Sequence, residues 1–357
     1  MLIEGKGMEE LRGALIGAGF FARNHMQAWR DLASEGARIA GVCDLDPARA
    51  QTMAEEFGAE PFTDPVRMLD VLSPNFVDIA TTPPSHRALI ELCAPRTRLV
   101  ICQKPIADSH SDAAAMVEAC ERAGVPFLIH ENFRWQRPFM RLQELLREGA
   151  IGTPRFMHLS FRHRWDVYAG QPYLATVPRL AIMDMGVHLF DLLRLFLGEA
   201  EAINCETQRR NPQVAGEDGF TALTRHEGGA VGVTDCSFHT LRRPEPFPQT
   251  MTRLEGDEGT LELLEDYRLL IHDAQGRREE DVEPSVPAWG EKPWHVVQDS
   301  VRNFERHALQ VLRGEAAPQP SGADNLRTLE LCLAAYESAA TGRRVELGTF
   351  VLGEVAA

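Results

Sequence analysis

The chain has few cysteines and no motif that would pair them. Its seven cysteines include no C-x-x-C spacing, so the sequence predicts neither a disulfide framework nor a structural zinc site. No run of about twenty apolar residues could span a bilayer, and the first ten residues lack the basic and apolar regions of a secretory signal. Reduced thiols and the missing signal favour the cytoplasm, away from any membrane.

Basic charge is also scarce. The 37 Lys and Arg residues against 52 Asp and Glu residues give a net charge of −15, without a concentrated basic run. This acidity argues against a nucleic-acid partner or an anionic membrane surface. Apolar residues make up 44% of the 357 residues, enough to build sizeable cores in a chain that is too long for one ordinary domain.

A nucleotide-binding fingerprint lies near the N-terminus. An apolar strand leads into the pattern Gly17-x-Gly19-x-x-Ala22, and a helical pattern follows. Gly17 permits a sharp turn, Gly19 lets a pyrophosphate approach the backbone, and Ala22 allows close packing of helix on strand. The amides at the helix start would then face phosphate oxygens.

An acidic residue follows the second apolar strand, residues 39–43. Asp44 can bind ribose hydroxyls there and would repel a 2′-phosphate, which favours NAD over NADP. Asp46 and Arg49 nearby leave dual use of NADP open. The alternative is that Asp44 caps the helix that begins at Pro47.

Further strand patterns at residues 76–80, 99–102 and 126–129 alternate with helical stretches, as in a doubly wound parallel sheet that binds ligands where its strands end. Lys104 follows one such end, where its ammonium could polarise a substrate oxygen or relay a proton. A solvated surface lysine is the alternative. The predicted cofactor-binding residues are Gly17, Gly19, Phe20, Phe21, Ala22, Asp44, Thr81, Thr82, Pro83, His86, Gln103 and Lys104.

A second group of titratable residues lies mid-chain. On a helix, their four-residue spacing would place Asp184 and His188 on one face. A carboxylate beside a histidine that titrates near neutral pH predicts a proton-transfer site. Alternatively, Asp184 is a helix cap and His188 a satisfied core histidine. A metal site with a further histidine ranks below both.

Three motifs occur in an order and spacing that resemble the Gfo/Idh/MocA oxidoreductases: Gly17-x-Gly19-x-x-Ala22, Gln103-Lys104-Pro105 and Asp184-x-Gly186-x-His188-x-x-Asp191. The resemblance implies an α/β protein with a Rossmann NAD(P)-binding domain over residues 1–130. It also implies a second α/β domain over residues 131–357, with a large open, mainly antiparallel sheet and a tail that partly returns to the first domain. The implied activity is NAD(P)-dependent oxidation or reduction of a sugar or polyol, with Lys104, Asp184 and His188 as the catalytic group and no metal.

One residue departs from the family pattern. Gln103 stands where the family usually has glutamate. The loss of a negative charge beside Lys104 should make the ammonium form of this lysine less favoured. This leaves the division of base and electrostatic roles between Lys104 and His188 open.

Sugar recognition needs hydrogen-bonding groups for the hydroxyls and flat apolar surfaces for the C–H faces. Two segments, residues 131–136 and 162–173, have that chemistry at the expected domain cleft. A packing or surface role is the alternative for each residue. The predicted substrate-binding residues are Lys104, Asn132, Arg134, Arg162, Trp165, Tyr173, Asp184 and His188.

Within the family, the sequences at 102–105, 130–136 and 171–173 resemble those of D-apiose dehydrogenases. This resemblance implies that NAD accepts a hydride from the anomeric carbon of an aldose, giving the lactone. The alternatives are another sugar or polyol dehydrogenase, an NAD-dependent glycoside hydrolase without net NADH production, and a sugar or NAD sensor without turnover. A broad sheet with an uncovered face commonly associates with its copy, so a homodimer or homotetramer is expected.

Overall fold

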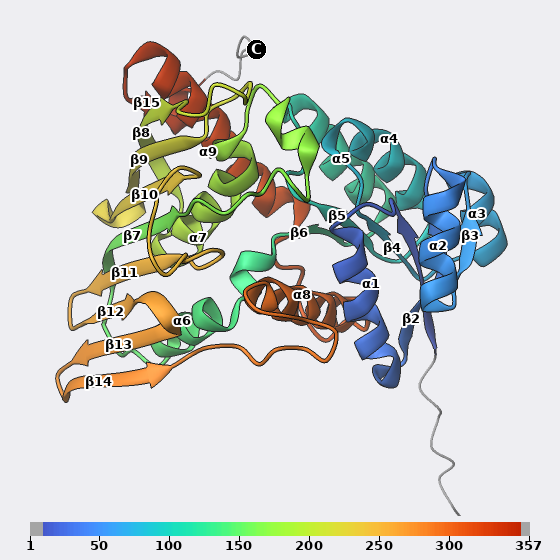
Figure 1. Cartoon of the computed structure of the whole chain (residues 1–357), viewed down its shortest axis with the longest axis horizontal. Helices are drawn as coiled ribbons and strands as arrows, with labels where there is room; N and C mark the ends of the chain where they lie inside the picture. Colours follow the sequence, from blue (N-terminus) through green and yellow to red (C-terminus); the bar gives the residue numbers. More distant parts are fainter. Residues whose placement is uncertain (1–9, 351–357) are drawn as a thin grey trace, which may run out of the picture. The chain divides into compact units, whose positions relative to one another are not determined.

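The computed structural model describes residues 10–350, and backbone contacts divide them into two units (Figure 1). Unit 1 comprises residues 10–130 and 301–324, and unit 2 comprises residues 131–300 and 325–350. Helix α8 (His295–Leu312) therefore begins in unit 2 and ends in unit 1, and α9 (Gly322–Thr341) leads back to unit 2. Among the described residues, no helix is both long and apolar enough to cross a membrane.

Unit 1 is built on a six-stranded sheet in which every strand pair is parallel. The strand order is β3-β2-β1-β4-β5-β6, so the order reverses between β1 and β4, where doubly wound sheets bind their ligands. The four strand patterns that follow the glycine turn in the sequence correspond to β2, β4, β5 and β6. The strands are β1 (Leu11–Ile16), β2 (Ala37–Cys43), β3 (Glu60–Phe62), β4 (Phe76–Ile79), β5 (Val100–Gln103) and β6 (Phe127–His130).

The helices of unit 1 begin at local sequence signals. Asp46 and Asp64 each accept a hydrogen bond from the backbone amide two residues on, and a proline follows each of them at the first helical position. Asp46, and not Asp44, is thus the cap of α2. The helices are α1 (Ala22–Asp31), α2 (Pro47–Phe57), α3 (Pro65–Leu72), α4 (Pro83–Cys93) and α5 (His110–Ala123).

Unit 2 is built on a nine-stranded sheet of order β14-β13-β12-β11-β7-β10-β9-β8-β15. Among the strand pairs that residues 10–350 form in this sheet, only β7 and β10 are parallel, so the sheet is mainly antiparallel. The strands are β7 (Pro154–Arg162), β8 (Ala200–Gln208), β9 (Gly219–His226), β10 (Val231–Ser237), β11 (Met251–Gly256), β12 (Thr260–Leu263), β13 (Arg268–Asp273), β14 (Gly276–Asp281) and β15 (Val345–Glu346).

Helices cover one face of this sheet. Strand β7 alternates between buried Met157, Leu159 and Phe161 and half-buried residues that point the other way. Helix α7 (Val187–Leu197) packs on β7 and β10, and α6 (Arg137–Arg147) and α9 lie on the same side of the sheet as α7 (Figure 1). On the opposite face of the sheet, Leu223 is 49% exposed. The predicted fold class, a Rossmann domain joined to an α/β domain with a large open sheet, is confirmed.

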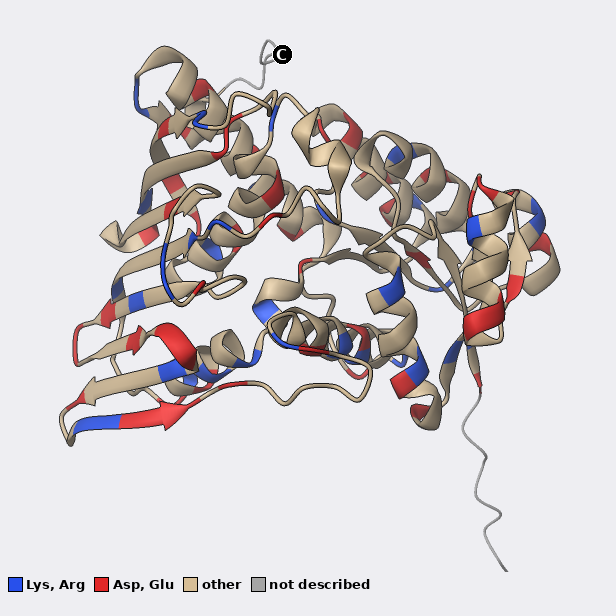
Figure 2. Ribbon diagram, viewed as in Figure 1, with Lys and Arg blue, Asp and Glu red and all other residues tan. Residues whose placement is uncertain are grey.

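Acidic and basic side chains are interspersed over both units (Figure 2). Many form surface ion pairs, for example Arg155 with Asp257 at 2.7 Å and Arg268 with Glu279 at 2.7 Å. Exposed pairs of this kind contribute about 0 to 1 kcal/mol each to stability. The net negative charge therefore acts on solubility more than on the fold.

Candidate active site

The glycine turn of unit 1 has the geometry that a dinucleotide requires. Gly17 follows β1 with φ +97°, and a Cβ there would lie 2.8 Å from the carbonyl oxygen of Ala80. A Cβ on Gly19 would meet nothing within 4 Å, so there is open space in which a phosphate can approach the backbone. Phe21 at the N-cap of α1 supplies no side-chain acceptor, which leaves the first amides of the helix available to an anion.

Asp44 lies at the carboxyl end of β2, next to this turn. Its Oδ2 accepts the amide of Ala18 at 2.7 Å, and its Oδ1 accepts the amide of Asp46 at 2.8 Å. The carboxylate is thereby fixed beside the glycine turn, and each oxygen retains acceptor capacity for a ribose hydroxyl. Together with the space at Gly19, this arrangement fits NAD.

We expect Asp44→Ser to raise the ratio of kcat/KM with NADP to kcat/KM with NAD by about ten-fold, equivalent to ~1.4 kcal/mol. The serine hydroxyl can still accept a hydrogen bond, but the charge that repels a 2′-phosphate is gone. Steady-state kinetics with both cofactors give the ratio. Asp64→Asn, which alters only the cap of α3, is the matched control. An unchanged ratio in Asp44→Ser would remove Asp44 from cofactor selection.

His86 supports the loop after β4 through contacts with backbone carbonyl oxygens. This buried histidine lies 3.0 Å from the carbonyl oxygen of Ile106 through Nδ1 and 3.2 Å from that of Thr81 through Nε2. Burial lowers the pKa of His86 despite these carbonyl contacts. Thr82 and Pro83 form the start of α4. The four predicted residues thus occupy one strand end, and His86 acts there as a neutral support for the loop.

The side chain of Gln103 contacts the backbone of Lys104 and the ring of His25. Its Oε1 accepts the backbone amide of Lys104 at 2.7 Å, and its Nε2 lies 3.1 Å from Nε2 of His25. Nδ1 of His25 lies 2.9 Å from Asp78. Burial lowers the pKa of His25, but the carboxylates of Asp78 and Glu305 outweigh this effect and raise the pKa to about 10. A glutamate at 103 would place its charge against His25, so its expected direct effect on Lys104 becomes smaller.

A buried polar cluster surrounds His25. Glu305 of α8 lies 3.2 Å from His25 Nδ1 and 3.6 Å from Nε2 of His130, and all three side chains are fully buried. Burial and the charge of Asp78 raise the pKa of Glu305 well above its ordinary value. His25, His130 and Glu305 are close enough to share a metal ion, but the raised pKa of His25 favours a protonated ring, which disfavours metal binding. The cluster instead joins the C-terminal segment of unit 1 to its sheet.

In unit 2, the helical stretch that contains Asp184 and His188 is not α-helical throughout. Residues Ile182–Gly186 form a π-helical turn, and the regular helix α7 begins only at Val187. A π-helical turn widens the helix, so Asp184 and His188 do not have the simple four-residue register of an α-helix. Single π-turns of this kind occur frequently at functional sites.

The charge of Asp184 acts on two further titratable groups, His163 and Tyr168. Burial lowers the pKa of His163 to about 4, against the opposing effect of the Asp184 carboxylate. Burial also raises the pKa of Tyr168 to about 12, and the charges of Asp218 and Asp184 add to this shift. Both residues belong to the segment 162–173, which is rich in polar and aromatic residues.

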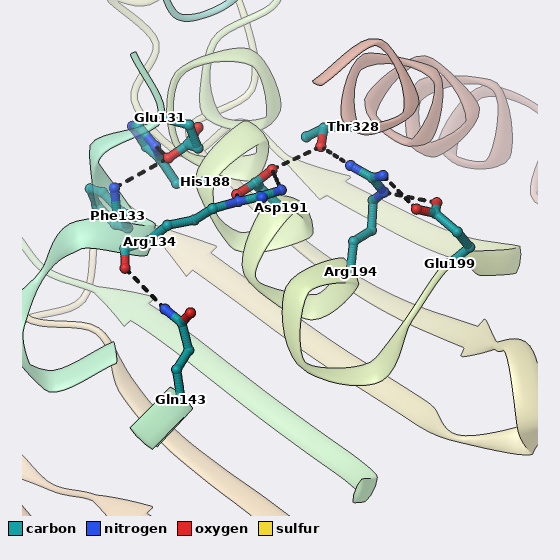
Figure 3. A network of polar contacts seen from close by, with 9 residues as sticks. All are labelled: Glu131, Phe133, Arg134, Gln143, His188, Asp191, Arg194, Glu199 and Thr328. Atoms are coloured by element: carbon teal, nitrogen blue, oxygen red, sulfur yellow. Dashed lines mark hydrogen bonds and ion pairs between the residues drawn. The ribbon is translucent and has the colours of Figure 1, made fainter. Parts of the chain in front are cut away.

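His188 is bonded to a carboxylate 57 positions away in the sequence, Glu131 (Figure 3). The bond joins His188 Nδ1 to Glu131 Oε1, and both side chains are buried. The imidazole also stacks on the ring of Phe133, with centroids 4.0 Å apart and planes 6° from parallel. His188 is therefore a buried histidine, as the alternative had it, but its partner is a carboxylate, which also suits proton transfer.

Two predicted substrate-binding residues lie in the interior of unit 2. Arg134 is 5% exposed and holds Asp191 through both Nε and Nη2, the latter at 2.7 Å (Figure 3). Asn132 is 3% exposed and donates to Ser300 Oγ at 2.7 Å. These contacts give both residues a role in holding the segment after β6, and leave little surface for a sugar.

Arg162 lies on the opposite face of the sheet from α7. It alternates with the buried Phe161 at the end of β7, and its Nη1 donates to Asp235 at 2.8 Å. Because α7 carries His188, this position does not favour contact of Arg162 with the same substrate. Trp165 and Tyr173 remain 38% and 48% exposed, and Trp165 stacks on Phe247 with planes 7° from parallel.

Each of the two units matches a known family model. Residues 11–131 match the model described as "Oxidoreductase family, NAD-binding Rossmann fold", and residues 139–262 match the GFO/IDH/MocA C-terminal domain. The chain belongs to the Gfo/Idh/MocA oxidoreductase family. Unit 1 of this Gfo/Idh/MocA protein is its NAD-binding domain, which confirms the cofactor prediction.

Several family members are similar to this chain over nearly its whole length. The D-apiose dehydrogenase of Paraburkholderia graminis is 48% identical over 95% of this chain and 90% of its own length. That of Rhizobium rhizogenes is 44% identical over 96% and 99%. A crystal structure of an oxidoreductase from Agrobacterium radiobacter in complex with NAD+, L-tartaric acid and magnesium is 44% identical, covers 96% of this chain and 100% of its own, and has a TM-score of 0.92.

Proposed function

We propose that this protein oxidises the anomeric hydroxyl of D-apiose, or of a closely similar aldose, to the lactone with NAD as the acceptor. The similarity to two D-apiose dehydrogenases over more than nine-tenths of the chain carries the proposal. The geometry agrees with it, because the chain offers a dinucleotide turn in unit 1 and a buried, carboxylate-bonded histidine in unit 2.

Each proposed catalytic residue has a separate task. Bound NAD supplies a nicotinamide carbon that accepts the hydride. His188 takes the hydroxyl proton at Nε2, the ammonium of Lys104 polarises the substrate oxygen, and the charge of Asp184 supports the positive charge that develops. Trp165 and Tyr173, whose aromatic rings are partly exposed, offer flat surfaces to the C–H faces of the sugar.

The open face of the nine-stranded sheet is the proposed self-association surface. Leu223 on β9 is 49% exposed there, and Val231 and Val233 on β10 are only half-buried. A second copy that packs against this face would bury these side chains in a homodimer or homotetramer. We further propose a cytoplasmic enzyme whose partner is the sugar, with neither a nucleic acid nor a membrane.

The first test is NADH formation, followed by absorbance, with NAD or NADP and a panel of aldoses, including D-apiose, and cyclic polyols. We expect activity with NAD on D-apiose that Lys104→Ala abolishes. Lys292→Ala is the matched control, because Lys292 is a surface lysine paired with Glu283.

Other results of the same assay would favour the alternatives. Turnover restricted to cyclic polyols would replace the aldose with a polyol. Release of sugar from glycosides without net NADH would identify the hydrolase, and NAD binding without any turnover would identify a sensor.

A further inference from the structure

We propose that Glu131 is the positioning residue that makes His188 a proton acceptor, by holding the imidazole proton on Nδ1. This inference rests on the proposed function, in which His188 accepts the substrate proton. No sequence motif pairs the two residues, because Glu131 directly follows β6 and His188 lies in α7.

The hydrogen bond fixes the tautomer of His188. Glu131 Oε1 bonds Nδ1, and the same oxygen accepts the backbone amide of Phe133 at 3.4 Å. An ionised carboxylate only accepts hydrogen bonds, so the proton of a neutral His188 lies on Nδ1. In this tautomer Nε2 carries the lone pair, so it is the ring nitrogen that can accept a hydroxyl proton.

Phe133 fixes the plane of the same ring. Its side chain stacks on the imidazole at 4.0 Å and 6°. The segment Asn132–Trp135 forms a 3-10 turn, with Glu131 as its N-cap. One short stretch of chain therefore sets both the protonation site and the orientation of His188, as expected of a supporting shell around a catalytic base.

A second contact holds this stretch in register with α7. Arg134 lies three residues after Glu131, and its partner Asp191 lies three residues after His188 (Figure 3). Residues three apart share a face both in a 3-10 turn and in an α-helix, so the two contacts act side by side. Thr328 also donates to Asp191 at 3.1 Å. This arrangement gives the aspartate at the end of the Asp184-to-Asp191 motif a structural task.

The energetic reason for a glutamate at 131 is its charge. When His188 takes a proton, the buried carboxylate faces a newly formed imidazolium, and an opposite charge at hydrogen-bond distance favours the charged form. The dyad therefore stabilises the product of proton transfer as well as the correct tautomer, by the logic of a carboxylate–histidine pair in hydrolases. Asp184 acts from another position, where its charge affects His163 and Tyr168.

The test compares Glu131→Gln with the wild type. We expect kcat to fall by about 10 to 100-fold, while the KM for the sugar and the affinity for NAD change little. The acidic limb of the pH–rate profile should move to lower pH, because the imidazolium loses its carboxylate partner. Glu131→Asp, which keeps the charge, should recover part of the rate. Glu199→Gln is the control, because Glu199 pairs with Arg194 in the same unit.

A measurement independent of activity uses nitrogen NMR of the histidine rings. The His188 signals, assigned by their loss in His188→Gln, should show the proton on Nδ1 in the wild type and change in Glu131→Gln. A proton on Nε2 in the wild type would overturn the inference, as would a wild-type kcat and pH profile in Glu131→Gln. If the wild-type protein oxidises no sugar, the proposed function fails, and NMR still decides the role of Glu131. If His188→Ala abolishes turnover but Glu131→Gln does not, only the inference on Glu131 fails.

Discussion

Replacing His188 by alanine is expected to lower kcat by about 10² to 10⁴-fold, the usual contribution of a positioned general base. The substrate proton then has no acceptor, although the nucleotide turn in unit 1 is untouched. Binding of NAD should therefore be unchanged, and the loss should appear in kcat. NADH formation under saturating sugar and NAD, together with a fluorescence titration of NAD, separates the two quantities.

A histidine of the same unit provides the control for this variant. His272 on β13 is half-buried and lies 3.4 Å from Glu262 at the protein surface, so His272→Gln should retain the wild-type rate. Near-normal turnover in His188→Ala would show that His188 is only a core histidine and would leave Lys104 as the candidate base.

Arg134→Ala is expected to reduce the free energy of unfolding by about 3 to 5 kcal/mol, the usual effect of removing one partner from a buried ion pair. Asp191 is fully buried, and burial raises its pKa against the opposing effect of Arg134. Without Arg134, the buried Asp191 carboxylate would lose the opposite charge that offsets the cost of its desolvation. Urea unfolding at neutral pH measures the change.

The dependence of this deficit on pH provides a second check. Loss of Arg134 should raise the pKa of Asp191 in the folded state further, so the folded variant binds a proton more readily than the unfolded chain does. The deficit relative to wild type should thus be largest at neutral pH and shrink as the pH falls through that folded-state pKa. Arg137→Ala, which removes only an exposed pair with Glu144, should cost about 1 kcal/mol or less. An equal cost for both variants would contradict the structural role of Arg134.

Local features of the fold could be predicted from the sequence because local physics decides them. The turn at Gly17 needs a positive φ, and Gly19 exposes its backbone to a phosphate because it has no side chain. The position of Arg162 is also decided locally. Its alternation with Met157, Leu159 and Phe161 already places it on the face away from the core.

Contacts between distant segments could not be predicted in this way. Glu131 meets His188 only because the folding of unit 2 brings the 3-10 turn at Asn132–Trp135 against α7, and Glu305 contacts His25 although 280 positions separate them. The residues next to Glu131 and Glu305 in the sequence do not indicate which histidine each carboxylate contacts. The π-turn at Ile182–Gly186 could not be predicted either, since the local sequence is compatible with an ordinary helix.

Because unit 1 is made of two separate stretches of the chain, the order of synthesis affects when this unit can fold. Unit 1 takes its last segment from residues 301–324, so a ribosome must have made 324 of the 357 residues before this unit has all of its parts. An emerging N-terminal half, although it contains all six strands of the first sheet, still lacks Glu305 and the pairing of Ser321 with Leu128. The nucleotide domain is therefore expected to complete its folding only after residue 324 has been made, unlike N-terminal domains that fold before the following domain is made.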